Sequence, residues 1–164
     1  MTVEIVRADY GDPRHAEAIV ELLDAYARDP MGGGQPLNDK SKAGLVAALA
    51  ARPTALSVLA FVDGEPAGLI NAFEGFSTFK CAPLLNIHDV AVSPAFRKRG
   101  LARRMLKVVE VLAVERGCCK LTLEVLDGNG PAKALYDSIG FAGYSLDPAT
   151  GSARFWEKPL PAQA

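Results

Sequence analysis

The segment at residues 93–105, SPAFRKRGLARRM, has the residue types and spacing of an anion-binding turn. It contains the pattern R-x-x-G-x-A, in which Gly100 allows a sharp change of main-chain direction and Ala102 keeps a second position small. Where such a turn opens a helix, successive main-chain N–H groups point into one concavity at the positive end of the helix dipole. The pattern therefore predicts a phosphate site. An ordinary glycine turn before a solvated basic helix is the alternative.

Basic side chains concentrate in the same segment. Residues 97–107 carry six of them and no acidic one: Arg97, Lys98, Arg99, Arg103, Arg104 and Lys107. The chain as a whole has 18 Lys and Arg against 19 Asp and Glu, a net charge of −1, so the rest of it is acidic. A concentrated cationic loop suits a ligand with several phosphate charges, whereas a general nucleic-acid binder is usually basic over a whole domain. The absence of a G-x-x-x-x-G-K-[ST] sequence excludes a Walker A loop.

Hydrophobic periodicity predicts the elements that position this turn. Residues 84–92 indicate a buried strand before it, residues 100–116 a long helix after it, and residues 121–126 a second strand. Such a βαβ unit requires its two strands to run parallel with a right-handed crossover. The apolar face of the long helix is expected to consist of Leu101, Met105, Val108, Val109 and Leu112.

The remaining segments predict hairpin-linked strands and shorter helices. Strands are expected at residues 3–7, 57–62 and 67–73, with a closing pair at 141–146 and 154–158; helices are expected at 15–28, 42–51 and 131–139. The order is β-α-α-β-β-β-α-β-α-β-β. It predicts an α/β (α+β) fold with a mixed, mainly antiparallel central sheet of about 6–7 strands and helices on both faces.

Length and composition fit a single domain over residues 1–164. Apolar residues make up 49% and charged residues 23% of the chain, which excludes the disordered class. The longest charge-free run, residues 53–62, is about half of what a membrane helix needs. No secretory signal is visible, which favours the cytoplasm. Three cysteines and two histidines form no metal-ligand pattern, so no metal is implied.

Three polar side chains interrupt the apolar strand at residues 84–92: Asn86, His88 and Asp89. The two-residue period of a strand places His88 on the same side as Asn86 and Val90, with Asp89 on the opposite side as a structural residue. An imidazole has an ordinary pKa of about 6.5, which suits removal of a proton from an alkylammonium group directly or through water. A buried, hydrogen-bonded core histidine is the alternative.

Two segments taken together, HDVAVSPAFRKRGLARRML and NGPAKALYDSIGF, resemble the core of the GNAT superfamily of acetyl-CoA-dependent N-acetyltransferases. The resemblance is strongest over residues 84–141, and the order of elements matches that fold throughout. It implies transfer of the acetyl group of acetyl-CoA to a primary amine of a small molecule, by direct attack within a ternary complex. The family's usual assembly is a homodimer.

The resemblance also assigns binding roles. The main chain of Val90 and Val92 would pair with the pantetheine arm of CoA, and Asn129 would hydrogen-bond to that arm, although Asn129 could also be a turn or N-cap residue. Main-chain N–H groups of the strand at residues 84–92 would stabilise the oxyanion. The pyrophosphate would lie in the turn made by Arg97, Arg99, Gly100, Leu101, Ala102, Arg103 and Arg104.

Two residues are implied in proton transfer. Tyr136 matches the family tyrosine that lies beside the CoA sulfur and would protonate the departing thiolate. It also belongs to an apolar helical stripe with Ala132 and Ile139, so a core position is the alternative. His88 would take the proton of the amine. Some relatives carry a Glu near the position of Asn86, and this chain lacks that version of the base.

The acceptor site is the least specified. Glu74 could attract a cationic amine, Glu124 could hold a water molecule for the base, and Asn86 lies on the same strand as His88. The glycine-rich loop at residues 32–37 lies where the family places acceptor-binding residues. Alternatives to a small-molecule amine are a protein N-terminus or lysine as acceptor, and a non-catalytic acyl-CoA-binding module. A nucleic-acid binder using RKRGLARR would show steep salt dependence; neither nucleic acid nor membrane is expected as a partner.

Overall fold

The central sheet is built from the most apolar part of the chain. The structure is a computed structural model that describes residues 1–162, and the chain divides into two compact units, Met1–Leu123 and Glu124–Ala164. In the first unit, β2 (Ala55–Val62) is buried along its whole length, and β3 (Glu65–Ser77) returns beside it. Asp63 and Gly64 join the two strands with φ angles of +50° and +88°, which agrees with the two-residue turn that their types predict.

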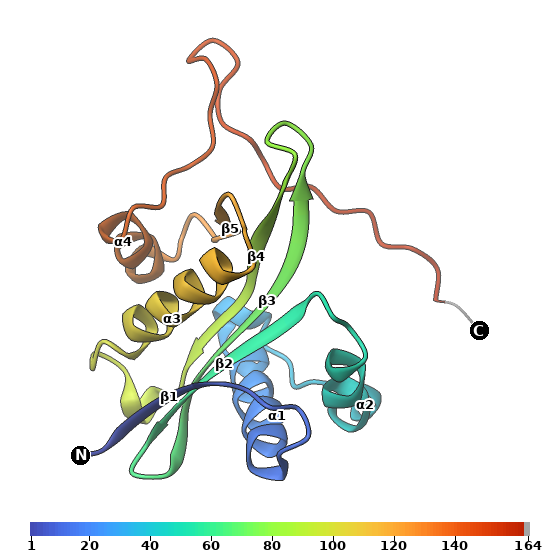
Figure 1. The fold of residues 1–164 in the computed structure, drawn as a ribbon, viewed down its shortest axis with the longest axis vertical. Helices are drawn as coiled ribbons and strands as arrows, with labels where there is room; N and C mark the ends of the chain where they lie inside the picture. Colours follow the sequence, from blue (N-terminus) through green and yellow to red (C-terminus); the bar gives the residue numbers. More distant parts are fainter. Residues whose placement is uncertain (163–164) are drawn as a thin grey trace. The chain divides into compact units, whose positions relative to one another are not determined.

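The sheet of the first unit has five strands in the order β1-β2-β3-β4-β5 (Figure 1). The edge strand β1 (Val3–Arg7) and the strands β2, β3 and β4 (Ala82–Val92) pair antiparallel, whereas β5 (Leu121–Leu123) pairs parallel to β4. The predicted mixed, mainly antiparallel sheet is therefore confirmed, and so is the parallel pair that flanks the long helix.

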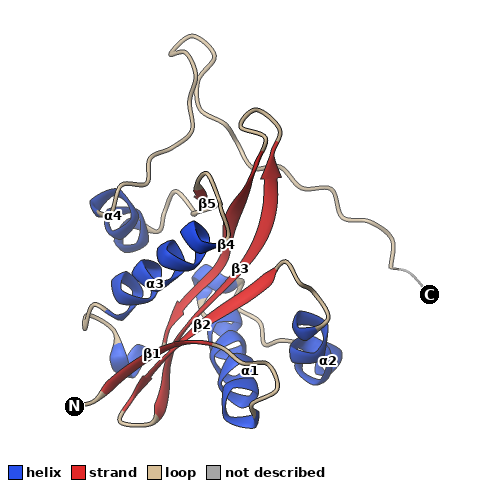
Figure 2. Cartoon of the chain, viewed as in Figure 1, coloured by secondary structure: helices blue, strands red, loops and turns tan. Residues whose placement is uncertain are grey.

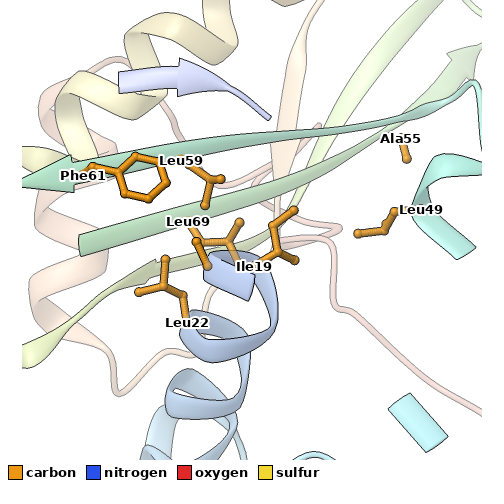
Figure 3. Close-up of a cluster of buried hydrophobic side chains, with 8 residues drawn as sticks. Ile19, Leu22, Leu49, Ala55, Leu59, Phe61 and Leu69 are labelled. Atoms are coloured by element: carbon orange, nitrogen blue, oxygen red, sulfur yellow. The ribbon is translucent and has the colours of Figure 1, made fainter. Parts of the chain in front are cut away.

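Helices pack on both faces of this sheet, as predicted. Helices α1 (Pro13–Arg28) and α2 (Asp39–Ala50) cover one face, and α3 (Leu101–Glu115) covers the other (Figure 1). We call these the α1 face and the α3 face. Because side chains alternate along a strand, successive residues of β2 contribute to the two cores in turn. Figure 3 shows the core of the α1 face, in which Ile19 and Leu22 pack against Leu59, Phe61 and Leu69. Burial of this apolar surface is the main stabilising contribution.

The α3 face has its own core, which includes Val62, Ala67 and Leu101. The buried stripe of α3 differs slightly from the predicted one, because Leu106 and Ala113 are buried while Val108 and Leu112 are only partly so. A shift of this size is expected when a helix also packs its flank on neighbouring elements. Two short 3-10 helices, η1 (Pro30–Gly32) and η2 (Pro94–Phe96), lie in the loops that follow α1 and β4.

The prediction of a closing strand pair is wrong, so the sheet has five strands instead of about 6–7. Residues 141–146 and 154–158 lie outside any strand (Figure 2), and an isolated antiparallel bridge joins Ser145, in the first segment, to Ser152, which precedes the second. A turn does form, since Gly151 N donates to Asp147 O at 3.1 Å. The turn is not extended into strands because the flanking apolar side chains, such as Phe155 and Trp156, stay exposed, and an isolated hairpin without a packed face is marginal.

The second unit contains one helix among its described residues, α4 (Gly130–Ser138). The predicted strand at residues 121–126 ends at Leu123, so Glu124 lies in coil after it. None of the helices in the described part of the chain is long and apolar enough to span a membrane. The expectation of a single domain over residues 1–164 stays a prediction.

Candidate functional site

The turn between β4 and α3 has the geometry of an anion site. Lys98 and Gly100 have φ angles of +62° and +73°, and Gly100 is the N-cap residue of α3. No side chain of the described chain caps this helix end, and the first N–H groups of any helix have no partner within the helix. A Cβ added at Gly100 would meet no atom within 4 Å, so the space beside the turn is open. The helix N-terminus, with its positive dipole end, is therefore accessible to an anionic ligand.

The six basic side chains of residues 97–107 are all exposed, and Arg97 and Arg99 among them contact neighbouring groups. Arg97 donates from Nε to Val92 O at 3.2 Å and from Nη2 to Asp29 Oδ2 at 3.2 Å. Arg99 stacks on the Phe96 ring, with 5.4 Å from its Cζ to the ring centroid. The main chain of the turn, more than the Arg97 side chain, is thus arranged to receive a ligand.

One edge of β4 is open where the turn begins. β5 pairs with β4 only from Leu85 to Ile87. Beyond Ile87, no strand in the described part of the chain pairs with that edge, while the other edge stays paired with β3 up to Val92. The main chain of Val90 and Val92 lies along the open edge, which is what an extended ligand needs to bind as an additional strand.

A β-bulge in β4 changes which side chains share a face. Asn71 opposes Asp89 and the next residue, Ala72, opposes Ile87, so His88 is an extra residue in β4. A bulge of this kind interrupts the alternation of side chains. Asp89 consequently faces the α1 side together with Asn71, and Val90, opposite Ile70, faces the α3 side.

Two details of the predicted strand are therefore wrong. Asp89 does not face away from His88, and Val90 does not face the same side as His88. The cause is the extra residue, because one inserted residue reverses the facing of every later position. The predicted sharing of a face by Asn86 and His88 is consistent with the structure, since Asn86 opposes Phe73 and the His88 ring contacts Phe73.

His88 is exposed on the α1 face. Its ring meets Phe73 edge-on, with centroids 5.6 Å apart and an interplanar angle of 77°. The alternative of a buried core histidine is thus wrong. Asn86 lies two residues before His88 in β4. Its Nδ2 donates to Thr122 Oγ1 at 3.0 Å, which links β4 to β5 just before the two strands separate.

A buried chain of polar side chains ends at Asp89. Ser57 Oγ donates to Asn71 Oδ1 at 2.6 Å, and Asn71 Nδ2 donates to Asp89 Oδ2 at 3.0 Å. Since the one hydroxyl hydrogen of Ser57 is used on Asn71, the 2.9 Å contact between Tyr10 Oη and Ser57 Oγ has Tyr10 as donor. Ser57 and Asn71 are 0% and 2% exposed. This chain was not predicted, although a single polar residue inside each of two apolar strands, Ser57 and Asn71, is a signal for it.

The carboxylates of Asp89 and Asp29 act on the same tyrosine of α1. Tyr26 is half-buried, and its pKa is raised by burial first and then by the negative charges of Asp89 and Asp29. Both carboxylates are therefore close enough to Tyr26 to act on its hydroxyl electrostatically. His88 shares the α1 face with Asp89, so this region combines a potential base with negative charge.

Among the other predicted acceptor residues, Glu74 lies on the opposite face of the sheet from His88. Glu74 accepts from Arg116 Nη1 at 3.2 Å. It opposes Leu85 and lies next to Phe73, hence on the α3 face. Glu124 lies outside β5, at the start of the second unit. Asn86 shares a face with His88, whereas Glu74 does not.

The second unit holds two predicted cofactor residues. Asn129 is the N-cap of α4, and its Oδ1 accepts from Ala132 N at 3.3 Å, so the N-cap interpretation is confirmed. Tyr136 is buried, with its ring 5.8 Å from that of Phe141. This packing agrees with a place in the helical stripe. The roles of both residues toward CoA stay predictions.

Comparison with known proteins identifies the family. The model of the acetyltransferase (GNAT) family matches residues 17–141, so the chain belongs to this family. A thialysine N-epsilon-acetyltransferase of Caenorhabditis elegans is 37% identical over 83 residues, 51% of this chain and 51% of that protein. The N-alpha-acetyltransferase RimI of Mycobacterium tuberculosis is 35% identical over 88 residues, 52% of this chain and 54% of that protein. The chain thus spans about half the length of these curated relatives.

Solved structures show the same fold. The aminoglycoside N-acetyltransferase AAC(6')-Iy, solved in complex with CoA, has a TM-score of 0.72 at 19% identity, covering 96% of this chain and 95% of that one. At this identity the likeness concerns the fold alone. The predicted GNAT-like fold is therefore confirmed, with the strand count corrected to five.

The buried polar chain makes a testable prediction about stability. Asn71→Ala removes the link between Ser57 and Asp89, and we expect it to lower the free energy of unfolding by about 1–3 kcal/mol, because a buried hydroxyl and a carboxylate lose their partner. Asn71→Asp should lower the free energy of unfolding more than Asn71→Ala does at neutral pH, because two carboxylates would meet. The loss should be smaller at acid pH, where one of them is protonated. Urea unfolding between pH 4 and pH 8 measures both effects. An unfolding midpoint that neither substitution moves would contradict the role of the chain.

Proposed function

We propose that this protein is an acetyl-CoA-dependent N-acetyltransferase whose acceptor is a primary amine of a small molecule. The observation that carries the proposal is the turn between β4 and α3. It combines an uncapped helix N-terminus, two residues with positive φ and open space beside Gly100, and it follows an open strand edge. Membership in the GNAT family supports the same conclusion.

The described residues fit CoA as the donor. A pyrophosphate needs several N–H donors and positive charge, and the first turn of α3 offers main-chain donors flanked by Arg99, Arg103 and Arg104. Leu101 is buried and anchors this turn, and Ala102 keeps the second position small. The pantetheine arm carries amide groups, which can pair with the main chain of Val90 and Val92 at the open edge of β4.

Acetyl-CoA supplies a thioester whose carbonyl carbon is open to attack by an amine. An alkylammonium group with a pKa of about 10.4 is almost entirely charged at neutral pH and must lose a proton before it can attack. His88, exposed on the α1 face, is proposed to take that proton directly or through water. Main-chain N–H groups of β4 are proposed to stabilise the negative charge on the carbonyl oxygen.

Two residues of the second unit complete the proposal. Tyr136 is proposed to donate a proton to the departing thiolate, and Asn129 to hydrogen-bond to the pantetheine arm in addition to capping α4. Both assignments rest on the resemblance of the segment NGPAKALYDSIGF to the family. Residues 1–164 are proposed to act as one domain, as a homodimer and in the cytoplasm.

The acceptor is proposed to carry more than one cationic group. Asp89 places negative charge beside His88 on the α1 face, which would attract an ammonium group other than the one that reacts. The named substrates of the relatives, thialysine and aminoglycosides, are amines. Glu74 and Glu124 are weaker candidates for acceptor contacts, because Glu74 is paired with Arg116. A protein N-terminus is the second candidate, supported by the RimI relative.

Binding of CoA is tested through Gly100. Gly100→Ala forces a residue with a side chain into a φ of +73°, which costs about 1 kcal/mol, and it places a methyl group in the open space beside the turn. We expect the wild-type melting temperature to rise with added CoA, and the rise to shrink strongly in Gly100→Ala. Gly44→Ala, on α2 with nothing within 4 Å of the added Cβ, is the matched control. A protein that CoA does not stabilise, but that RNA or DNA does, would refute the proposal.

The role of His88 is tested by the pH dependence of turnover. His88→Ala should reduce kcat/KM about 100-fold near pH 7, and the loss should diminish as pH rises, because more of the amine is then uncharged in solution. His15→Gln, a change at the other histidine, which accepts from Asp9 N, serves as the control and should keep the wild-type profile. A His88→Ala profile parallel to that of the wild type at all pH values would remove His88 from proton transfer.

A panel of amines tests the reaction and distinguishes enzyme from binding module. Thiol release from acetyl-CoA is measured with thialysine, lysine, a polyamine, an aminoglycoside and a peptide N-terminus. We expect a small polyamine-like amine to give the highest rate, and Tyr136→Phe to lower kcat while CoA still binds. Thiol release that no amine stimulates would indicate a binding module, and preference for the peptide would indicate the second candidate.

A further inference from the structure

Arg97 joins two loops that are far apart in the sequence. Its guanidinium donates to Val92 O at the end of β4 and to Asp29 Oδ2 at the end of α1, both at 3.2 Å. Asp29 and Arg97 are separated by 68 residues in the chain. A planar guanidinium can donate in two fixed directions at once, which a lysine cannot do. The side chain therefore fixes the distance between the open edge of β4 and the start of the loop after α1.

Asp29 organises the loop that it begins. Its Oδ1 accepts from Met31 N at 2.9 Å, and its main-chain oxygen accepts from Gly32 N at 2.8 Å and from Gly34 N at 3.0 Å. The hydrogen bond from Met31 N, followed by that from Arg97, holds the pKa of the Asp29 carboxyl below its ordinary value. Asp29 is thus charged at neutral pH and connects Arg97 to the main chain of residues 31–34.

The same loop is held against the last turn of α1. A Cβ added at Gly32 would collide with the carbonyl oxygen of Tyr26, so only glycine allows this approach. Gln35 N donates to Ala27 O at 3.0 Å. At the far end, Asp24 accepts from Leu37 N at 2.9 Å and pairs with Lys42 at 3.4 Å. Residues 29–37 therefore form an ordered segment, which we call the rim, beside Tyr26. The pKa of Tyr26 is raised by burial and by the negative charges of Asp89 and Asp29.

We propose, on the basis of the proposed function, that Arg97 is a positioning residue for the amine acceptor and not a ligand of the CoA phosphates. Through Asp29 it holds the rim at residues 29–37 in register with the end of β4, beside the α1 face that carries His88 and Asp89. The acceptor is bound between this rim and that face. Two nitrogens of the Arg97 guanidinium, Nε and Nη2, already donate to Val92 O and Asp29 Oδ2.

Two substitutions and their combination test this proposal in the full chain. Arg97→Gln removes the charge and the fork, and Asp29→Asn removes the charge while its side-chain oxygen can still accept from Met31 N. The control pair is Arg14→Gln and Glu4→Gln, since Arg14 Nη2 and Glu4 Oε2 form an exposed ion pair at 3.0 Å away from both loops. Hydrogen exchange of the amides of residues 29–36 is measured by mass spectrometry, CoA affinity by calorimetry, and acceptor KM and kcat with the best amine of the panel.

We expect Arg97→Gln and Asp29→Asn to raise amide exchange in residues 29–36 and acceptor KM by about threefold to tenfold each. Acceptor KM and amide exchange in the double variant should be no higher than in the more affected single variant, because both substitutions remove the same Arg97–Asp29 interaction. CoA affinity and kcat should stay within about twofold of the wild type, and the control variants should change none of these quantities.

Weaker CoA binding in Arg97→Gln but not in Asp29→Asn, with unchanged exchange, would identify Arg97 as a phosphate ligand and overturn the proposal. Unchanged exchange and acceptor KM in both variants would also overturn it, by showing an inert surface pair. Failure of the proposed function looks different: no amine of the panel is then acetylated, whereas the exchange of residues 29–36 still reports whether Arg97 holds the rim.

Discussion

One extra residue in β4 determines the arrangement of the candidate site. His88 stands outside the regular pairing of β3 and β4, because Asn71 opposes Asp89 while Ala72 opposes Ile87. The other edge of β4 loses its partner at the same place, since β5 pairs no further than Ile87. β4 is therefore irregular at its edge with β3 at the same place where its other edge loses β5 as a partner. A bulge bends and twists a strand locally, and this bulge coincides with the separation of β4 from β5.

The buried polar chain explains how the bulge is held. A polar group inside a core is costly unless it is hydrogen-bonded, yet Tyr10, Ser57, Asn71 and Asp89 form an unbroken series across the sheet. Within the described residues, no buried side-chain nitrogen or oxygen lacks a partner. The series runs from β2 through β3 to the bulged part of β4, so a return to regular pairing would turn Asp89 away and leave Asn71 without its acceptor. Hydrogen bonding thus selects the bulged register.

Most of the fold could be predicted because its signals are local or nearly so. Periodicity identified α1 and α3, and the Asp63-Gly64 pair identified the hairpin of β2 and β3. The turn at Gly100 could also be predicted, since a glycine after a buried strand and before a long helix permits few conformations. The absence of the closing strands could not be predicted. Their formation depends on whether side chains such as Phe155 and Trp156 find a surface to pack on, and the sequence of the segment itself does not show that surface.

The candidate site was less predictable for a related reason. The two-residue period holds only for regular strand pairing, and nothing in the residues LLNIHDVAV indicates that His88 is an extra residue in a bulge. The sharing of a face by Asn86 and His88 is consistent with the structure, whereas Asp89, which follows the extra residue, was assigned to the wrong face. The pairing of Arg97 with Asp29 was equally invisible, since it connects residues 68 positions apart. Every arginine of the basic segment was therefore predicted to bind phosphate, because the carboxylate that competes for Arg97, that of Asp29, is distant in the sequence.

Charge on the α1 face has two opposing effects in the proposed reaction. Carboxylates such as Asp89 attract a cationic amine, but the same negative field favours the ammonium form and raises the pKa of the group that must react. Attraction alone would therefore slow the chemistry. A base resolves the conflict only if it lies on the same face as the carboxylates, close to where the ammonium is held. In a regular strand, residues 88 and 89 would point to opposite faces; the bulge brings both to one face, so that one ammonium group of the acceptor can be bound beside the base that removes the proton of another.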